Sequence, residues 1–253
     1  MSASEKLGEY ESKEGFGATI FKNIELSLDP EQLWNTVFGT LQTFNIHSIS
    51  YYHMPPIGAH DVDTPYFKRI GQKEDLSRLT KIIFFDIERS FIHKVRSIDE
   101  VLSLKDFMDT SNLSEEQTHL FSEIHGESTL HGFVIPCHSA NGRSGCVVVE
   151  TLKSVETYKA DTLRLISAIA LSAHKAYSVL KRAETRPIKQ LTAREKQILT
   201  WVAHGKSNSV IADIIGISQH TVNGYLRSIY LKTNTSDRTT AVLRGLGDGL
   251  IDL

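Results

Sequence analysis

Polar and basic side chains near the C-terminal end recur on one side of a short apolar helical pattern. Val222, Leu226 and Ile229 have the spacing of a buried helix face. The residues that this spacing turns outward are Gln219, His220, Thr221, Asn223, Gly224 and Arg227. Short amide and hydroxyl groups and a guanidinium can distinguish base edges in the major groove of DNA. We therefore expect base contacts from Gln219, His220, Thr221, Gly224 and Arg227.

Contacts to phosphates need other groups, because they position a protein on a duplex without reading its sequence. The candidates are polar or basic residues in or beside the same helical patterns, namely Lys206, Asn208, Asn223 and Lys232. The two sets together predict binding to double-stranded DNA.

A helix-turn-helix would hold these side chains in place. Gly216 suits the left-handed residue that ends one helix, and Ser218 follows at once as the N-cap of the next. Ile217 and Val222 form a hydrophobic staple across that cap, which fixes the angle of the second helix. We expect the preceding helix to begin at Ser207 or Asn208 and to bury Ile211, Ala212, Ile214 and Ile215. Two short helices joined by a tight glycine turn are typical of this motif.

Two more helical patterns flank the motif. Thr192 and Glu195 have the spacing of a capping box, which starts a helix before it. A last helix is expected over Asp237–Gly247. Residues 191–253 are thus predicted to form an all-α, four-helix domain.

The stretch Leu191–Leu246 resembles the DNA-binding domain of the LuxR (LuxR/FixJ-type) transcriptional regulators. The residues that match the family pattern are Leu191, Thr192, Arg194, Glu195, Val202, Ala203, Gly205, Lys206, Ser207, Asn208, Ile211, Ala212, Gly216, Ile217, Ser218, Thr221, Val222, Leu226, Ile229, Tyr230, Lys232, Arg238 and Ala241. Asn223 and Tyr225 stand where the family usually has Lys and His, and Thr233-Asn234 replaces a Leu-Gly pair. The first departure removes one expected phosphate contact.

This resemblance implies a dimer on promoter DNA, either a homodimer or a heterodimer with a related regulator. RNA polymerase is a further implied partner. By family analogy, the last helix contributes to pairing through Ala241, Leu243 or Leu246. The residues leave one rival function open, an adaptor that has lost DNA binding and modulates another regulator by protein contacts.

Composition and charge are consistent with a globular protein of two unlike parts. The 253 residues are 40% hydrophobic and 23% charged, without an apolar run near the ~20 residues of a membrane span. The N-terminus lacks the apolar core of a signal peptide, so we expect a cytoplasmic protein without membrane contact. From Lys181 onward there are eleven Lys and Arg against six Asp and Glu, whereas residues 1–180 hold seventeen against twenty-four. A basic module joined to an acidic one fits a DNA reader attached to a domain of another role.

Residues 1–183 are expected to form an α+β domain, an α/β/α layered arrangement around an antiparallel sheet. A linker at 184–190 then leads to the C-terminal domain. The expected helices are Asp29–Thr43, a short one near Tyr66–Ile70, Lys81–Val95, Ser114–Ile124 and Val155–Ala183. The expected strands are Asn45–His53, Gly132–His138 and Gly145–Leu152, the last two joined by Asn141-Gly142.

The hairpin register decides what the two cysteines can do. A two-residue turn at Asn141-Gly142 places Cys137 directly opposite Cys146. A redox switch and a pair of packed, inert thiols are the alternatives, and the reducing cytosol favours the second.

The N-terminal region resembles the autoinducer-binding domain of many LuxR-type proteins, through Gly132–Pro136 and Asn141–Gly145. Motility regulators of the VisN/VisR subgroup share this likeness. The resemblance implies a small-molecule effector and hence quorum sensing. The family holds an acyl-homoserine lactone with residues of the patterns W-x-x-x-Y and D-P, but this sequence has no W-x-x-x-Y and no D-P in the corresponding region. Tyr66 and Asp86 occupy comparable places. The lactone is thus the weaker expectation, and another small ligand, a pocket filled by side chains or control by a partner regulator remains open.

Catalytic and metal chemistry finds no support in the motifs. His119, His125 and His131 are six residues apart, which fits neither a helix face nor a strand face, and no Cys-x-x-Cys accompanies them. Phosphate-cradling loops, nucleophile elbows and dinucleotide fingerprints are missing as well. We expect no enzyme, no metal and no cofactor.

Overall fold

The computed structural model describes two sets of elements. The residues that it describes are 16–61, 66–71, 94–110, 114–115, 118–119, 131–139, 142–151, 155–184 and 189–253. The elements before residue 185 are α2 (Phe16–Glu25), α3 (Pro30–Gln42), β1 (Ile46–Met54), β2 (Tyr66–Ile70), β3 (Leu102–Ser103), α6 (Leu104–Thr110), β4 (Gly132–His138), β5 (Ser144–Thr151), the 3₁₀ helix η3 (Val155–Thr157) and α8 (Ala160–Glu184). The later ones are α9 (Ala193–Ala203), α10 (Asn208–Ile215), α11 (Gln219–Thr233) and α12 (Arg238–Gly247).

The chain divides into two compact units. Unit 1 comprises Met1–Met54, Pro65–His138 and Ser144–Arg182. Unit 2 comprises Ala183–Leu253 together with two short loop segments, Pro55–Thr64 and Ser139–Arg143. In the part of the chain that the structure describes, no helix is both long and apolar enough to cross a membrane.

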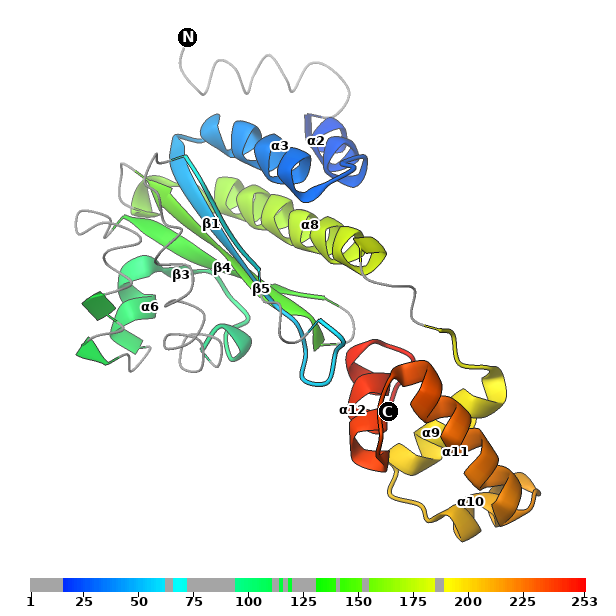
Figure 1. Cartoon of the computed structure of the whole chain (residues 1–253). Helices are drawn as coiled ribbons and strands as arrows, with labels where there is room; N and C mark the ends of the chain where they lie inside the picture. Colours follow the sequence, from blue (N-terminus) through cyan, green and yellow to red (C-terminus); the bar gives the residue numbers. More distant parts are fainter. Residues whose placement is uncertain are drawn as a thin grey trace. The chain divides into compact units, whose positions relative to one another are not determined.

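A five-stranded sheet in the order β2-β1-β5-β4-β3 forms the centre of unit 1, and every pair of neighbours is antiparallel. Helices α2, α3 and α8 lie along one face and α6 lies on the other (Figure 1). Successive side chains of a strand point to opposite faces, so Tyr51 packs in the layer with α3 and α8 whereas Tyr52 packs in the layer with α6. The predicted α+β layered fold is confirmed.

Local signals place the α3 helix correctly. Asp29 is its N-cap and accepts a hydrogen bond from the Gln32 amide at 2.8 Å, and Pro30 occupies the first helical position. Leu33, Trp34, Val37 and Leu41 are buried against the sheet. Burial of such an apolar stripe, more than helix propensity, holds an amphipathic helix in place.

Two expectations for the sheet are wrong. Tyr66–Ile70 is strand β2 and not a short helix, because all five residues pair with β1. The β4–β5 connection is also longer than two residues, since the ladder ends at the pair His138–Ser144 and pairs Cys137 with Gly145. Cys137 and Cys146 therefore point to opposite faces of the sheet, each fully buried in a different core layer.

Several other expectations concern residues outside the described ranges. They include Asp86, Asn141 and most of the helices expected over Lys81–Val95 and Ser114–Ile124. The long helix after β5 begins at Ala160, after η3, and extends to Glu184.

Candidate nucleic-acid interface

The helix-turn-helix geometry in unit 2 follows from three local devices. Ser207 caps α10 by accepting from the Val210 amide, and Ser218 caps α11 by accepting from the Thr221 amide at 3.0 Å. Gly216 ends α10 in the left-handed conformation with φ 69° and ψ 40°. A side chain at this φ would be strained, so glycine permits the abrupt turn between the two helices.

One face of α11 anchors it to the other helices. Val222, Leu226 and Ile229 are buried in a core that also contains Ile198 and Ile211. This core fixes the rotation of α11 about its own axis, which determines the side chains that face outward. Ile214, expected in the core, is instead 45% exposed on the outer side of α10.

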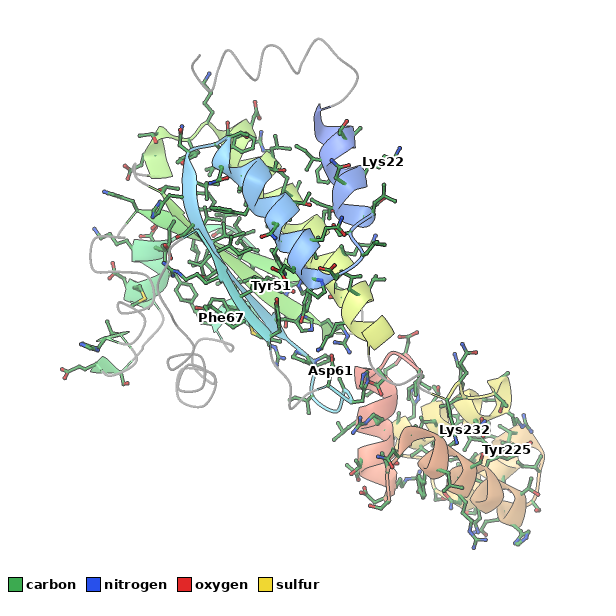
Figure 2. All side chains as sticks on the ribbon, turned by 45° about the horizontal axis from the view of Figure 1, so that its top comes forward. Lys22, Tyr51, Asp61, Phe67, Tyr225 and Lys232 are labelled. Atoms are coloured by element: carbon green, nitrogen blue, oxygen red, sulfur yellow. The ribbon has the colours of Figure 1, made fainter. Side chains whose placement is uncertain are left out.

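All five predicted base-contact residues lie on the outward face of α11. Gln219, His220, Thr221, Gly224 and Arg227 are exposed. They span the N-terminal half of the helix, the part that a recognition helix presents to base edges in the major groove. Figure 2 shows the side chains of the same helix and labels Tyr225 and Lys232.

Gly224 leaves open space in the middle of this exposed face. A Cβ atom built on it would meet no heavy atom within 4 Å. Glycine in the interior of a helix destabilises the helix by roughly 0.5–1 kcal/mol relative to alanine. The space around Gly224 would admit a side chain, so packing within unit 2 does not require glycine at this position. The backbone is therefore open to close approach at this point.

The predicted phosphate contacts divide into three situations. Lys206 is exposed just before the N-cap of α10. Asn208 and Asn223 are partly buried and hydrogen-bonded to each other, with Asn208 Nδ2 donating to Asn223 Oδ1 at 2.8 Å. Lys232 instead forms an ion pair within the domain, its Nζ 2.6 Å from Glu195 Oε2.

Glu195 joins the start of α9 to the recognition helix. It completes the predicted capping box by accepting from the Thr192 amide at 2.7 Å. Its other oxygen accepts from Ser228 Oγ at 2.6 Å, and Lys232 supplies the opposite charge. Burial alone would raise the pKa of Glu195, but these hydrogen bonds outweigh it and lower the pKa to about 2.

No sequence signal marked Ser228 or Arg238 as parts of the interface. Arg238 begins α12 and donates from NH1 to Asn208 Oδ1 at 2.9 Å and from NH2 to the Lys206 carbonyl. It was noted only as a residue of the family pattern. The hydrogen-bonded arrangement of Arg238, Asn208 and Asn223 depends on three helices meeting, which spacing along one helix does not reveal.

The end of α11 and the helix α12 after it contain two further features that the sequence singled out. Asn234 takes the left-handed conformation at the end of α11, with φ 52° and ψ 51°. Asparagine tolerates this region better than most residues, so the Thr233-Asn234 replacement keeps the helix end that glycine would give. On α12, Ala241 is buried, Leu246 is partly buried and Leu243 is 39% exposed.

In unit 1, the candidate ligand residue Tyr66 stacks on Tyr177, with ring centroids 4.7 Å apart. It belongs to the layer beneath α8, beside Tyr51, whose hydroxyl lies 2.8 Å from His174 Nδ1. Figure 2 labels Tyr51 and also Phe67, which packs in the opposite layer. Asp86, the other candidate ligand residue, lies outside the described residues.

The opposite face of the sheet carries a buried ion pair. Arg69 NH2 donates to Glu150 Oε2 at 2.8 Å, and the Ser48 hydroxyl donates to the same carboxylate oxygen. Glu150 is fully buried. A buried carboxylate is tolerable only where it is paired and hydrogen-bonded, as here.

Taken together, the caps, the glycine turn and the exposed polar face of α11 define a helix-turn-helix DNA-binding module. Residues 189–244 match the model for bacterial regulatory proteins of the luxR family. This C-terminal segment therefore resembles the helix-turn-helix domain of the luxR family of bacterial regulatory proteins.

Known proteins resemble the chain to different extents. The transcriptional activator protein LuxR of Aliivibrio fischeri is 28% identical over 149 residues, covering 57% of this chain and 59% of that protein. The quorum sensing-dependent regulator VjbR of Brucella ovis is 44% identical over 63 residues, covering 25% of this chain and 24% of its own length. The chain spans about half the length of the first curated relatives that it matches.

The fold of nearly the whole chain is found in a solved structure. Escherichia coli SdiA superposes with a TM-score of 0.71 at 19% identity, covering 93% of this chain and 98% of that chain. At this identity the likeness concerns the fold alone.

Proposed function

We propose that this protein is a sequence-specific DNA-binding transcriptional regulator of LuxR type. The observation that carries the proposal is the row of exposed side chains on α11, which the caps and the buried face of the helix turn outward. Gln219, His220, Thr221, Gly224 and Arg227 contact bases in this proposal. Lys206, Asn208 and Asn223 contact phosphates or position groups that do.

Two copies act together on DNA in this proposal. Paired recognition helices enter successive major grooves about one helical turn apart, and the exposed Leu243 of α12 contributes to pairing. The partner is a second copy or a related regulator, and RNA polymerase is the machinery that the bound dimer influences. Residues 191–253 read DNA, and residues 1–183 control them through the linker 184–190.

The test combines mapping of bound sites with duplex binding. Sites bound in cells supply the duplex, and affinity is then measured as a function of salt for the wild type and for Arg227→Ala. Loss of a guanidinium that contacts a base costs about 1–3 kcal/mol and relaxes specificity at one base pair. Lys196→Ala removes an exposed charge from α9 and serves as the control for charge alone.

Two results contradict the proposal in different ways. Unchanged affinity and footprint for Arg227→Ala place the reading face elsewhere. Failure of the wild type to bind any mapped duplex, with stable binding to another regulator, favours the protein-only adaptor. Specific binding that falls steeply with salt excludes the adaptor, because phosphate neutralisation releases counterions.

A small acyl-chain molecule is the proposed effector of residues 1–183. The support is one of likeness, since SdiA, a protein of the same fold, has been solved in complex with octanoyl-rac-glycerol. Native mass spectrometry of the purified chain with and without octanoyl-rac-glycerol tests this. A one-to-one complex supports a small-molecule receptor, whereas an empty protein that pairs stably with a related regulator favours control by that partner.

A further inference from the structure

Two side-chain amides and one guanidinium form a chain of hydrogen bonds across the helices of the DNA-binding domain. Arg238 of α12 donates to Asn208 Oδ1 at the start of α10, and Asn208 Nδ2 donates to Asn223 Oδ1 on α11. The Arg238 guanidinium also donates to the Lys206 carbonyl. Because this second bond holds the guanidinium to the backbone, the orientation of Arg238 is fixed, and Arg238 in turn orients Asn208.

The direction of each bond in this chain follows from chemistry. A guanidinium can only donate hydrogen bonds, so the Asn208 atom that faces it must be the carbonyl oxygen. The amide nitrogen of Asn208 is then the atom that faces Asn223, and it can only donate. Asn223 must therefore turn its own oxygen inward. Turning over either amide would set a donor against a donor or an acceptor against an acceptor.

The consequence is that Asn223 presents its amide nitrogen on the outer side of α11. That nitrogen makes no hydrogen bond to the residues that the structure describes. Asn223 is partly exposed, and Arg227, one helical turn further along the same helix, is exposed. An outward N–H donor beside a guanidinium is suited to an anionic oxygen and not to a cation or a base donor.

We propose that Arg238 is a positioning residue that acts through Asn208 to orient Asn223 as a donor to a DNA phosphate. This inference rests on the proposed DNA-binding function. It deepens that function at Asn223, where the family usually has Lys. A neutral, oriented amide makes the phosphate contact there in this proposal. Asn208 is then an internal member of the chain and not a phosphate ligand.

The test begins with substitutions that keep the hydrogen bonds inside the domain. Asn223→Asp retains an oxygen for Asn208 but replaces the outward N–H with a second oxygen, so duplex affinity is expected to fall at least about tenfold. Asn234→Asp makes the same chemical change at the other end of α11, where it leaves affinity nearly unchanged. Unfolding in denaturant checks that both variants remain folded.

A second variant tests the positioning role. Asn208→Asp still accepts from Arg238 but offers no donor to Asn223, which then rotates its nitrogen inward and exposes its oxygen. Affinity is expected to fall about as much as for Asn223→Ala. In the Asn223→Ala background, Asn208→Asp produces no further loss, because nothing is left to orient. If the affinity losses of the two single variants simply add up in the double variant, the positioning role of Asn208 is wrong.

Two further measurements report on the phosphate itself. Asn223→Lys is expected to raise affinity and to steepen the slope of log affinity against log salt by about one, since a cation releases a counterion and a neutral amide does not. Replacing single phosphates of the duplex with methylphosphonates is expected to identify one position where the difference between wild type and Asn223→Ala disappears. Absence of any such position contradicts the inference.

Failures of the inference and of the proposed function are separable. A wild-type chain that binds no duplex overturns both. A wild type that binds, is weakened by Arg227→Ala and is indifferent to Asn223→Asp and Asn208→Asp overturns the inference alone. A merely structural role for Asn208 predicts lower unfolding free energy with no change in the phosphate map.

Discussion

At Gly224, the stability of α11 and close approach of its backbone to DNA favour different residues. An added Cβ has free space, so Gly224→Ala is expected to raise the free energy of unfolding by about 0.5–1 kcal/mol through a less flexible unfolded chain and better helix propensity. If the backbone at this point approaches a base pair, the same change weakens specific DNA binding. Denaturant unfolding and duplex affinity, measured on one variant, separate the two effects.

Gly205 is a suitable control for this prediction. It also has no heavy atom near an added Cβ, but its φ is +75°. Gly205→Ala is therefore expected to destabilise the domain, because a side chain strains this backbone conformation. A stability gain for Gly205→Ala or a stability loss for Gly224→Ala contradicts this prediction.

Glu195 makes stability depend on pH. Its folded-state pKa of about 2 lies below the ordinary value of 4.5, so the carboxylate stabilises the folded state fully above pH 4.5. This contribution is lost as the pH falls from 4.5 toward 2, because the unfolded chain takes up the proton first. Unfolding followed from pH 7 to pH 3 is expected to show this decline.

Glu195→Gln provides the comparison for the pH effect. It removes the ion pair with Lys232 and weakens the cap on Thr192, which is expected to lower the unfolding free energy at pH 7 by about 2 kcal/mol. Between pH 4.5 and pH 3, the free energy of unfolding is expected to decline less in the variant than in the wild type. An identical decline in both proteins assigns the acid sensitivity to other carboxylates.

At the scale of elements, what could be predicted from the sequence depends on how local the signal is. The N-caps Thr192 and Ser218 and the αL residue Gly216 were all predicted, because each uses groups within four residues. The exposed face of α11 followed from the same helical spacing. These signals suffice to place the five candidate base-contact residues, since these residues lie on one helix.

Elements defined by long-range pairing were predicted less well. Every residue of β2 is only partly buried, so no alternation distinguished a strand from a helix, and pairing with β1 decides its conformation. The Asn141-Gly142 cue suggested too short a turn, which shifted the register by one residue. The bonds of Arg238, and those of Glu195 with Ser228 and Lys232, were missed for a similar reason, since they join residues about 30 positions apart or more.

The corrected register predicts inert cysteines. Burial raises the pKa of Cys137 to about 12 and raises that of Cys146 as well, and only the thiolate reacts readily. Both cysteines are expected to resist iodoacetamide in the native protein at neutral pH and to react after unfolding. Mass spectrometry of the alkylated chain measures this. An intramolecular disulfide under mild oxidation contradicts the placement of the two thiols on opposite faces.

At the scale of the whole molecule, the two units have separate cores. The helices of unit 2 bury Leu191, Ile198 and Ile251 among others, and none of the residues in this core belongs to unit 1. We expect two unfolding transitions in calorimetry. Ile198→Ala is expected to destabilise unit 2 by about 2–5 kcal/mol and to move one transition only. A single transition that shifts as a whole would falsify independent folding.

The Glu195–Lys232 ion pair has a consequence for the search for target sites. Because Lys232 is neutralised within the domain, Arg227 is the one cation of α11 without an acidic partner among the residues that the structure describes. Proteins slide along non-target DNA on the strength of their fixed positive charge. A recognition helix with so little fixed positive charge is expected to stay only briefly on non-target DNA. We therefore expect this domain to make many short visits to DNA, and single-molecule dwell times on non-target DNA to be correspondingly short.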